Sequence, residues 1–286
     1  MTQTQTIPTP PRSAPAVQSA TALSALRNHW PEYSIEAALL ATFMLSACVF
    51  GVLLEHPGSP LHQAVDDALT RRALVGIAMG CTLIGLVYSP WGQRSGAHMN
   101  PSVTLTFLTL GKIQPWDAAF YVASQFVGGV AGVFLSEVLL GPLLAHSAIN
   151  YAVTVPGPGG VGIAFLAEAL ISFLMMSVIL TVSNTRGLAP STGLFAGALL
   201  TAFITFEAPL SGVSLNPART LGSALAAGEW SGIWLYFIAP PLAMVVAGQA
   251  HRAPRGIHGV LCAKLHHTSN HRCIFNCNYG AIDVQQ

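Results

Sequence analysis

The sequence contains very few charged residues. Asp, Glu, Lys and Arg make up 8% of its 286 residues, whereas soluble domains carry about 25%. The formal net charge of +1 also argues against a nucleic-acid-binding protein, because such a protein presents a basic face to the phosphates. Long stretches have no charge at all, and 52% of the residues are hydrophobic. This composition predicts a membrane protein, whose spans need roughly 20 apolar residues each.

Enzyme motifs are also missing from the chain. We find no Ser-His-Asp, HExxH or P-loop pattern, so neither an enzymatic activity nor a cofactor is expected. A signal peptide is not expected either, since residues 1–30 lack a compact apolar segment behind a basic start. This stretch is rich in Thr, Gln, Pro and Ser and predicts a disordered cytosolic leader.

Six apolar segments are long enough to cross a bilayer. They are expected at residues 34–54, 71–91, 116–141, 162–183, 189–210 and 230–250. Three Gly-x-x-x-Gly spacings, beginning at Gly76, Gly128 and Gly193, permit close helix packing, which we expect within one subunit. The predicted fold is therefore an all-α membrane domain over residues 31–251.

One phrase occurs twice in the chain. Residues 95–105 read SGAHMNPSVTL and residues 211–221 read SGVSLNPARTL. Asn caps helix N-termini and Pro suits the first helical turn, so each phrase predicts a loop that becomes a helix. The apolar stretch after each phrase gives a helix of about 15 Å, which is half the hydrocarbon thickness. Neither helix can cross alone, but two that meet at the midplane span the bilayer together.

The two phrases are predicted to have opposite orientations. Three complete spans separate them, and an odd number of crossings inverts the second copy relative to the first. Each half also carries a Glu in its first span, Glu36 and Glu168. This is the inverted-repeat plan in which broken helices build a site at the bilayer centre. Irregular backbone at that depth is tolerated only inside protein or beside a watery cavity, so the phrases are predicted to be re-entrant loops that line a pore.

Basic residues are divided unequally between the two sides. Six crossings leave both termini on one side, and that side receives every Lys and Arg except Arg219, which belongs to the second phrase, and Arg71 and Arg72, which lie on the other side. The positive-inside rule therefore predicts cytosolic termini. The membrane is expected to be the plasma membrane, or the inner membrane of a bacterium.

These features resemble the major intrinsic protein family of aquaporins and glycerol facilitators. The resemblance covers about residues 34–250 and rests on the two Asn-Pro phrases, Glu36, Glu168 and Gln125. It implies six transmembrane helices plus two re-entrant half-helices, one pore in every subunit, and a homotetramer surrounded by membrane lipid. The first phrase has Ser102 where the commonest form has Ala, and this small residue is expected to let the half-helices meet.

The resemblance implies roles for both phrases. The Asn-Pro motifs at the half-helix starts are Asn100, Pro101 and Ser102, and Asn216, Pro217 and Ala218. The two Asn amides and the positive helix ends are expected to bind water and repel cations and protons. Glu36 and Glu168 are expected to anchor the loops by accepting backbone hydrogen bonds, with a proton relay as the alternative. The pore-lining loop residues are Gly96, Ala97, His98, Gly212 and Ser214, and His98 is expected to be structural or gating-related rather than metal-binding.

An ungapped count from the two phrases places the outer selectivity filter at Gly80, Ile204, Val213 and Arg219. Arg219 is expected to be the fixed cation, because an Arg at membrane depth is functional by default. The set lacks the large aromatic residue and the His of strict water channels, and it resembles the filters of plant channels for boric and arsenous acids. Thr220 and the pair Tyr236-Phe237 are instead similar to water channels. We expect a passive channel for water and small uncharged solutes such as glycerol, urea, boric acid or arsenous acid, closed to ions and protons.

Residues 252–286 are predicted to form a cytosolic tail that contains Cys and His. Its candidate metal ligands are Cys262, His266, His267, His271, Cys273 and Cys277. The two-residue spacing of paired zinc cysteines is absent, so free thiols are favoured over a metal site. Two other functions stay open. A secondary transporter also uses inverted repeats, although no further acidic pair suggests a coupling-ion site, and a membrane enzyme would have to act through the tail.

Overall fold

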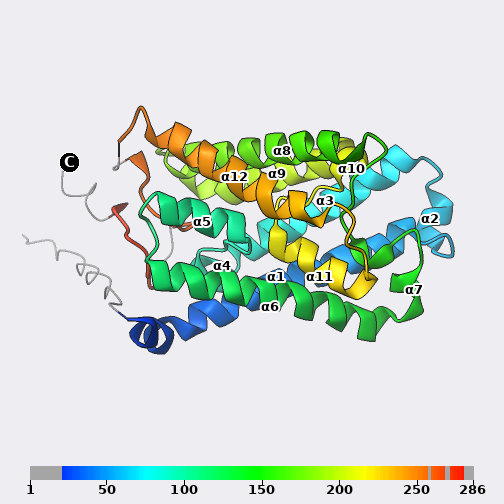
Figure 1. Cartoon of the computed structure of the whole chain (residues 1–286), viewed down its shortest axis with the longest axis horizontal. Helices are drawn as coiled ribbons and strands as arrows, with labels where there is room; N and C mark the ends of the chain where they lie inside the picture. The colour runs from blue at the N-terminus through cyan, green and yellow to red at the C-terminus, as the bar shows by residue number, and fades with distance from the viewer. Residues whose placement is uncertain (1–20, 257–258, 268–270, 280–286) are drawn as a thin grey trace, which may run out of the picture.

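Six long helices form the body of the protein (Figure 1). The computed structural model describes residues 21–256, 259–267 and 271–279, and this part of the chain contains helices and no strand. The helices that are long and apolar enough to cross a membrane confirm the six predicted spans. They are α1 (Ala22–Glu55), α3 (Ala68–Tyr88), α6 (Pro115–Leu140), α8 (Gly160–Ser183), α9 (Thr192–Phe206, preceded by η2, Ala189–Ser191) and α12 (Ile233–Arg252).

Two half-helices lie between α6 and α12 (Figure 1). The first, α5 (Pro101–Thr109), follows the short α4 (Pro90–Ser95), and the second, α11 (Pro217–Ala227), follows the short α10 (Ala208–Ser211). Each half-helix begins at the Pro of its Asn-Pro motif, as the sequence predicts, because Pro needs no backbone N–H partner there. The remaining short connections are α2 (Pro60–Ala64), α7 (Pro142–Ala145) and η1 (Asn150–Ala152).

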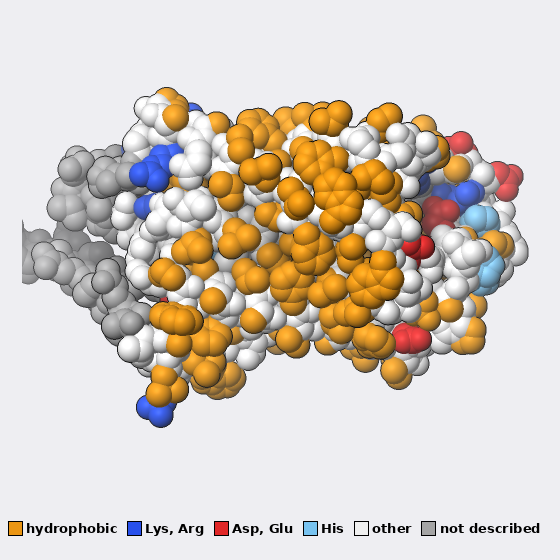
Figure 2. Space-filling view, viewed as in Figure 1, with side chains coloured by type: hydrophobic (Ala, Val, Ile, Leu, Met, Phe, Trp, Pro, Cys, Tyr) orange, Lys and Arg blue, Asp and Glu red, His pale blue; other side chains and the backbone are white. Residues whose placement is uncertain are grey.

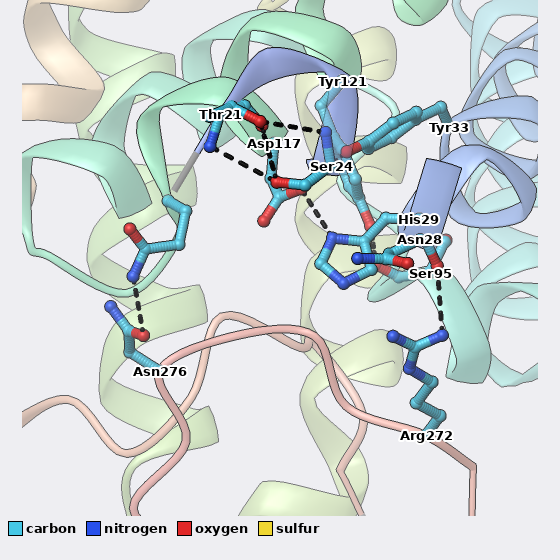
Figure 3. Close-up of polar contacts among 11 residues, drawn as sticks. Thr21, Ser24, Asn28, His29, Tyr33, Ser95, Asp117, Tyr121, Arg272 and Asn276 are labelled. Atoms are coloured by element: carbon cyan, nitrogen blue, oxygen red, sulfur yellow. Dashed lines mark hydrogen bonds and ion pairs between the residues drawn. The ribbon is translucent and has the colours of Figure 1, made fainter. Parts of the chain in front are cut away.

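The first helix starts earlier than predicted. Residues 22–30 belong to α1, whereas the sequence placed them in a disordered leader; residues 1–20 lie outside the described part. Thr21 and Ser24 form a reciprocal capping box that stabilises the helix start. About two turns after the N-cap, His29 Nδ1 lies 2.7 Å from Asp117 Oδ1 on α6, and the Tyr33 hydroxyl donates to the same oxygen at 2.6 Å (Figure 3). These buried contacts fasten the start of α1 to α6.

The outer surface separates an apolar middle from two polar ends. Figure 2 shows hydrophobic side chains over most of the central surface, with Lys and Arg, Asp and Glu, and His side chains near the ends. Many exposed Leu, Val, Ile and Phe residues belong to the spanning helices, such as Val138, which is 82% exposed. A soluble protein rarely presents so much apolar surface, so this band marks the part that faces lipid.

Glycines bring the spanning helices into close contact. A Cβ at Gly76 or Gly80 of α3 would lie within 2.7 Å of a backbone oxygen of α9. A Cβ at Gly128 or Gly132 of α6 would lie within 2.7 Å of the α1 backbone. The expected packing of these Gly-x-x-x-Gly pairs within one subunit is confirmed, and it leaves no room for side chains.

Substituting Gly80 with Phe is expected to separate α3 from α9. Its Cβ would collide with the Gly197 carbonyl oxygen at 2.6 Å and with the Thr201 hydroxyl. Overpacking of this kind costs about 1–3 kcal/mol or more. We expect a lower melting temperature and aggregated protein in size-exclusion chromatography in detergent. Gly85→Phe on the same helix is the control, because no atom lies within 4 Å of its added Cβ; equal stability of the two variants would contradict this packing.

Candidate functional site

The two Asn residues of the repeated phrases meet at the centre of the molecule. Asn100 Oδ1 caps its own half-helix by accepting from Ser102 N at 2.8 Å, and its Nδ2 donates to the Leu215 carbonyl at 2.8 Å. Asn216 Oδ1 accepts from Ala218 N at 3.0 Å, and its Nδ2 donates to the Met99 carbonyl at 2.7 Å. The two N-terminal ends are therefore linked to each other through reciprocal amide–carbonyl hydrogen bonds. Ser102 is fully buried and does not prevent the meeting.

The loops before the half-helices repeat the same unusual backbone. Gly96, Ala97 and Met99 have positive φ angles of 99°, 56° and 49°, and Gly212, Val213 and Leu215 have 85°, 53° and 58°. Non-glycine residues rarely adopt this region, and such strain persists only where the surroundings enforce it. The same order of positive φ angles in both copies shows that the inverted repeat extends to single residues.

Each loop is held by one buried Glu. Glu36 accepts from the Ser95 hydroxyl at 2.7 Å, from His98 N at 3.1 Å and from Met99 N at 2.6 Å. Gln125 Nε2 also donates to Glu36 at 2.9 Å.

The second loop repeats this arrangement around Glu168. This carboxylate accepts from the Ser211 hydroxyl at 2.8 Å, from Ser214 N and from Leu215 N at 2.9 Å. Because both Glu residues are fully buried, these donors replace the water that a carboxylate would otherwise need.

Two tyrosines complete the repeat and were not singled out from the sequence for this role. The Tyr121 hydroxyl of α6 donates to the Ser95 carbonyl at 2.6 Å, and the Tyr236 hydroxyl of α12 donates to the Ser211 carbonyl at 2.6 Å. Both side chains are fully buried. Each Tyr lies in the third span of its half. A closer alignment of the two halves of the sequence would have paired them.

Two adjoining cavities follow the pore axis. The larger, about 370 Å³, is lined by Met79, Ile204, Val213 and Arg219 among others. The smaller, about 90 Å³, is lined by Asn100, Asn216 and His98 among others. Arg219 lines both cavities, and its Nη1 nitrogen has no hydrogen-bond partner within the described part of the chain. This donor and its charge therefore lie between the two cavities.

Three of the four predicted filter residues come together, and Gly80 does not. Ile204, Val213 and Arg219 line the larger cavity. Gly80 instead faces the backbone of α9, and the preceding Met79 lines the cavity from α3. The ungapped count therefore gave the wrong α3 residue. The predicted loop residues are divided between the cavities, with Ala97 and His98 at the smaller, Gly212 at the larger and Ser214 at both; Gly96 lines neither.

The C-terminal residues lie against the first re-entrant loop. We call residues 259–267 and 271–279 the tail segment. Leu265 N donates to the Gly96 carbonyl at 3.1 Å, and the Ala263 carbonyl lies 2.8 Å from His98 Nε2. His98 Nδ1 lies 3.0 Å from the Thr104 hydroxyl, so both ring nitrogens are engaged, which agrees with a structural role. Leu265 also lines the smaller cavity, so the tail segment forms part of the wall at this end of the pore.

Four of the six candidate metal ligands form a cluster. The ligand atoms of Cys262, His267, Cys273 and Cys277 all lie within 4.8 Å of one another. His266 is not in the cluster: its ring packs against Tyr88. His271 is also outside, and its carbonyl accepts from Lys264 Nζ at 3.4 Å. Burial lowers the pKa of His267, but hydrogen bonds with Cys273 and Cys277 outweigh it and raise the value to about 9.

Comparison with known proteins decides the family. Residues 28–251 match the sequence profile described as Major intrinsic protein. The chain belongs to the major intrinsic protein family. Members of this family are membrane channels for water and small solutes, so this protein is a multi-pass membrane channel and not an enzyme.

Individual relatives agree with this assignment. The chain is 35% identical to "Aquaporin NIP1-3" of Oryza sativa subsp. japonica over 231 residues, which is 80% of this chain and 78% of the relative. It is 37% identical to "Aquaporin NIP2-1" of Zea mays over 168 residues, covering 58% of this chain and 54% of that protein. Among solved structures, the aquaglyceroporin from Plasmodium falciparum is similar in fold, with a TM-score of 0.64 at 20% identity, over 80% of this chain and 97% of that chain.

Proposed function

We propose that the pore is passive and passes water and small uncharged solutes while excluding ions and protons. The observation that carries this proposal is the meeting of Asn100 and Asn216 at one cavity. Each side-chain amide has two N–H donors, and one of them is bound to the opposite loop. The second donor of each amide is available to a permeating molecule that carries an acceptor oxygen. A cation there meets the positive ends of two half-helices, so it gains no equivalent partner.

The residues around Arg219 support a pore that is not restricted to water. Met79, Ile204 and Val213 give this part of the larger cavity an apolar lining with one fixed cation. An apolar wall offers few hydrogen bonds that would select water, and it accommodates the carbon skeleton of a polyol or urea. We infer that glycerol, urea and boric or arsenous acid are candidate permeants in addition to water.

A stopped-flow panel tests the proposal. Proteoliposomes with the purified protein are compared with protein-free vesicles for water, glycerol, urea and boric acid. The panel includes a Leu265→Ala, Phe275→Ala variant of the tail segment, because Leu265 lines the smaller cavity and Phe275 stacks on His98, which lines it too. Fluxes above the protein-free level that ignore ion gradients and do not saturate agree with a passive pore. Saturating, gradient-dependent flux would instead indicate a transporter.

Narrowing the larger cavity is expected to separate water from solutes. In an Ile204→Trp variant, we expect the glycerol-to-water permeability ratio to fall about tenfold, which corresponds to about 1.4 kcal/mol of added barrier. Water is the smaller molecule, so its permeability falls less than that of glycerol. The control is Phe206→Trp on the same helix, where the side chain is 73% exposed on the outer surface. An unchanged ratio in a folded Ile204→Trp channel would place the constriction elsewhere.

We also propose a homotetramer with cytosolic termini in the plasma membrane, or in the inner membrane of a bacterium. The distribution of Lys and Arg supports this orientation, and the family resemblance supports the tetramer. Native mass spectrometry from detergent measures the subunit number. Labelling of a terminal tag in intact and in permeabilised cells measures the orientation. Cytosolic termini should be labelled only after permeabilisation, and labelling in intact cells would contradict this orientation.

A further inference from the structure

The cluster in the tail segment has the dimensions of a metal site. Cys262 Sγ lies 3.5 Å from Cys273 Sγ, and Cys277 Sγ lies 3.0 Å from His267 Nε2. Four ligands at zinc bond lengths of about 2.3 Å (sulfur) and 2.0 Å (nitrogen) form a tetrahedron with edges of about 3.5–3.8 Å. The separations here, none above 4.8 Å, bracket these edges. Small side-chain adjustments therefore suffice to place an ion between the four atoms.

The donor set indicates which metal this is. Three thiol sulfurs and one imidazole nitrogen are the Cys₃His set of structural zinc sites, and no carboxylate takes part. Soft sulfur ligands disfavour Mg²⁺ and Ca²⁺, which prefer oxygen. The spacing C-x4-H-x5-C-x3-C differs from the familiar two-residue spacing, which is why the sequence favoured free thiols. The fold brings the four ligand atoms together, although their spacing in the sequence does not predict this.

The surroundings of the cluster fix the His ligand. The His267 ring stacks on Tyr279 with ring centroids 4.3 Å apart and planes 1° from parallel. The Tyr279 hydroxyl donates to the carbonyl of Ser183, the last residue of α8, at 3.0 Å. The imidazole is thus oriented by a side chain that is itself tied to a spanning helix, as second-shell groups orient metal ligands.

The tail segment buries many side chains but has almost no regular secondary structure. Ala263, Leu265, Ile274 and Phe275 are each at most 4% exposed. A short irregular segment has few backbone hydrogen bonds of its own, so a bound metal is a common way to hold such a unit together. The cluster joins its two described parts, residues 259–267 and 271–279.

Contacts around the pore end hold the tail segment in place. Arg272 Nη1 donates to the Asn28 carbonyl at 3.1 Å (Figure 3). Asn276 Nδ2 donates to the Gly111 carbonyl at 2.8 Å. On the α8 side, Leu261 N donates to Asn184 Oδ1 at 2.6 Å. These partners belong to α1, to the loop after α5 and to the end of α8, so the segment is attached on several sides of the opening.

The centre of the tail segment lies on residues of the pore itself. The Phe275 ring stacks on His98 with centroids 5.4 Å apart, and it lies next to Gly96, where an added Cβ would be 2.8 Å away. Leu265 N donates a hydrogen bond to the Gly96 carbonyl, and Leu265 is one of the residues that line the smaller cavity. His98 and Leu265 both line the smaller cavity, so a permeating molecule would have to pass these two residues.

We propose that Cys262, His267, Cys273 and Cys277 bind one Zn²⁺ ion, and that the ion holds the tail segment across this end of the pore and so restricts permeation. Nothing in the family resemblance requires such a device. The metal site does not depend on the permeants proposed above, whereas the restriction of flux does, so the two parts are measured separately.

Metal content tests the site. We expect about one zinc per chain in the purified full-length protein by elemental mass spectrometry, and less than a tenth of that in Cys273→Ser and Cys277→Ser. Cys81→Ser on α3 is the matched control and keeps its zinc, because Cys81 is an exposed residue far from the cluster along the chain. Replacing zinc with Co²⁺ in the wild-type protein should give the absorption bands of a tetrahedral thiolate site, a result that does not require any variant to fold. Wild-type protein without zinc or cobalt bands, or a disulfide between Cys262 and Cys273, would overturn the site.

Flux measurements test the restriction. A membrane-permeant chelator is expected to raise the water permeability of wild-type proteoliposomes several-fold, and zinc is expected to restore the low value. The Leu265→Ala, Phe275→Ala variant should conduct at the high level while it still binds zinc. If this variant conducts and the wild-type flux is the same with and without zinc, the restriction is refuted. If no protein conducts above empty vesicles, the proposed channel activity fails, and the metal content still decides the site.

Discussion

Replacing Glu168 with Ala is expected to abolish the recovery of folded, monodisperse protein. The substitution removes the acceptor for the Ser211 hydroxyl and for the backbone N–H groups of Ser214 and Leu215, all of which are buried. A buried donor without a partner costs about 1–3 kcal/mol, so three donors together cost roughly 3–9 kcal/mol. That sum is comparable to the whole stability of many domains. Expression and size-exclusion profiles in detergent measure the effect.

Two further variants separate anchoring from charge. Glu137 also lies on a spanning helix, but its carboxylate accepts a single hydrogen bond, from the Tyr151 hydroxyl. The Glu137→Ala variant should therefore remain folded. Glu168→Gln keeps one acceptor oxygen but turns an NH₂ group toward a backbone donor, so an intermediate loss of stability is expected. A stable Glu168→Ala channel with normal flux would show that the loop conformation does not depend on this residue.

The elements that the sequence predicted correctly are those with a local physical cause. Span positions follow from apolar length, and the half-helices follow from Asn-Pro capping, which is readable within a few residues. The inverted relation follows from counting crossings between the two phrases. The contacts of Glu36 and Glu168 with the loops could be anticipated because a buried carboxylate needs donors and backbone N–H groups are near.

The errors concern features that depend on tertiary packing. Counting residues along α3 does not tell which face meets α9, and Gly80 is used there for a close helix contact, which leaves Met79 for the cavity. The Thr, Gln, Pro and Ser content of residues 1–30 predicted a leader over the whole stretch, but α1 begins at Ala22 and continues through Pro31. Asp117 on another helix holds this start in place by binding His29 and Tyr33, and composition alone does not show that contact. The folding of the tail onto the pore left no signal in the spacing of its Cys and His residues.

Replacing Arg219 with Val is expected to keep water flux and to raise proton and cation leak at least tenfold. A unit charge at about 5 Å raises the energy of a passing cation by about 3 kcal/mol at an effective dielectric constant of 20, equivalent to roughly a hundredfold in rate. Arg219 lies between the two cavities, so every permeant passes near this charge. The half-helix ends still repel cations in the variant, which is why the expected increase is smaller than the full hundredfold.

The leak is best measured on a background in which the tail contacts are removed. Proteoliposomes of the Leu265→Ala, Phe275→Ala channel, with and without Arg219→Val, are loaded with a pH-sensitive dye and given a potassium diffusion potential. Arg72→Val is the matched control: Arg72 belongs to the first turns of α3 and lines the larger cavity, but unlike Arg219 it does not line the smaller one. Arg219→Lys, which retains the cation, should leak less than Arg219→Val. If Arg219→Val and the parent channel leak equally, the barrier to ions depends on the Asn100 and Asn216 junction rather than on this guanidinium, since the two positive helix ends are the remaining repulsive charges on the path.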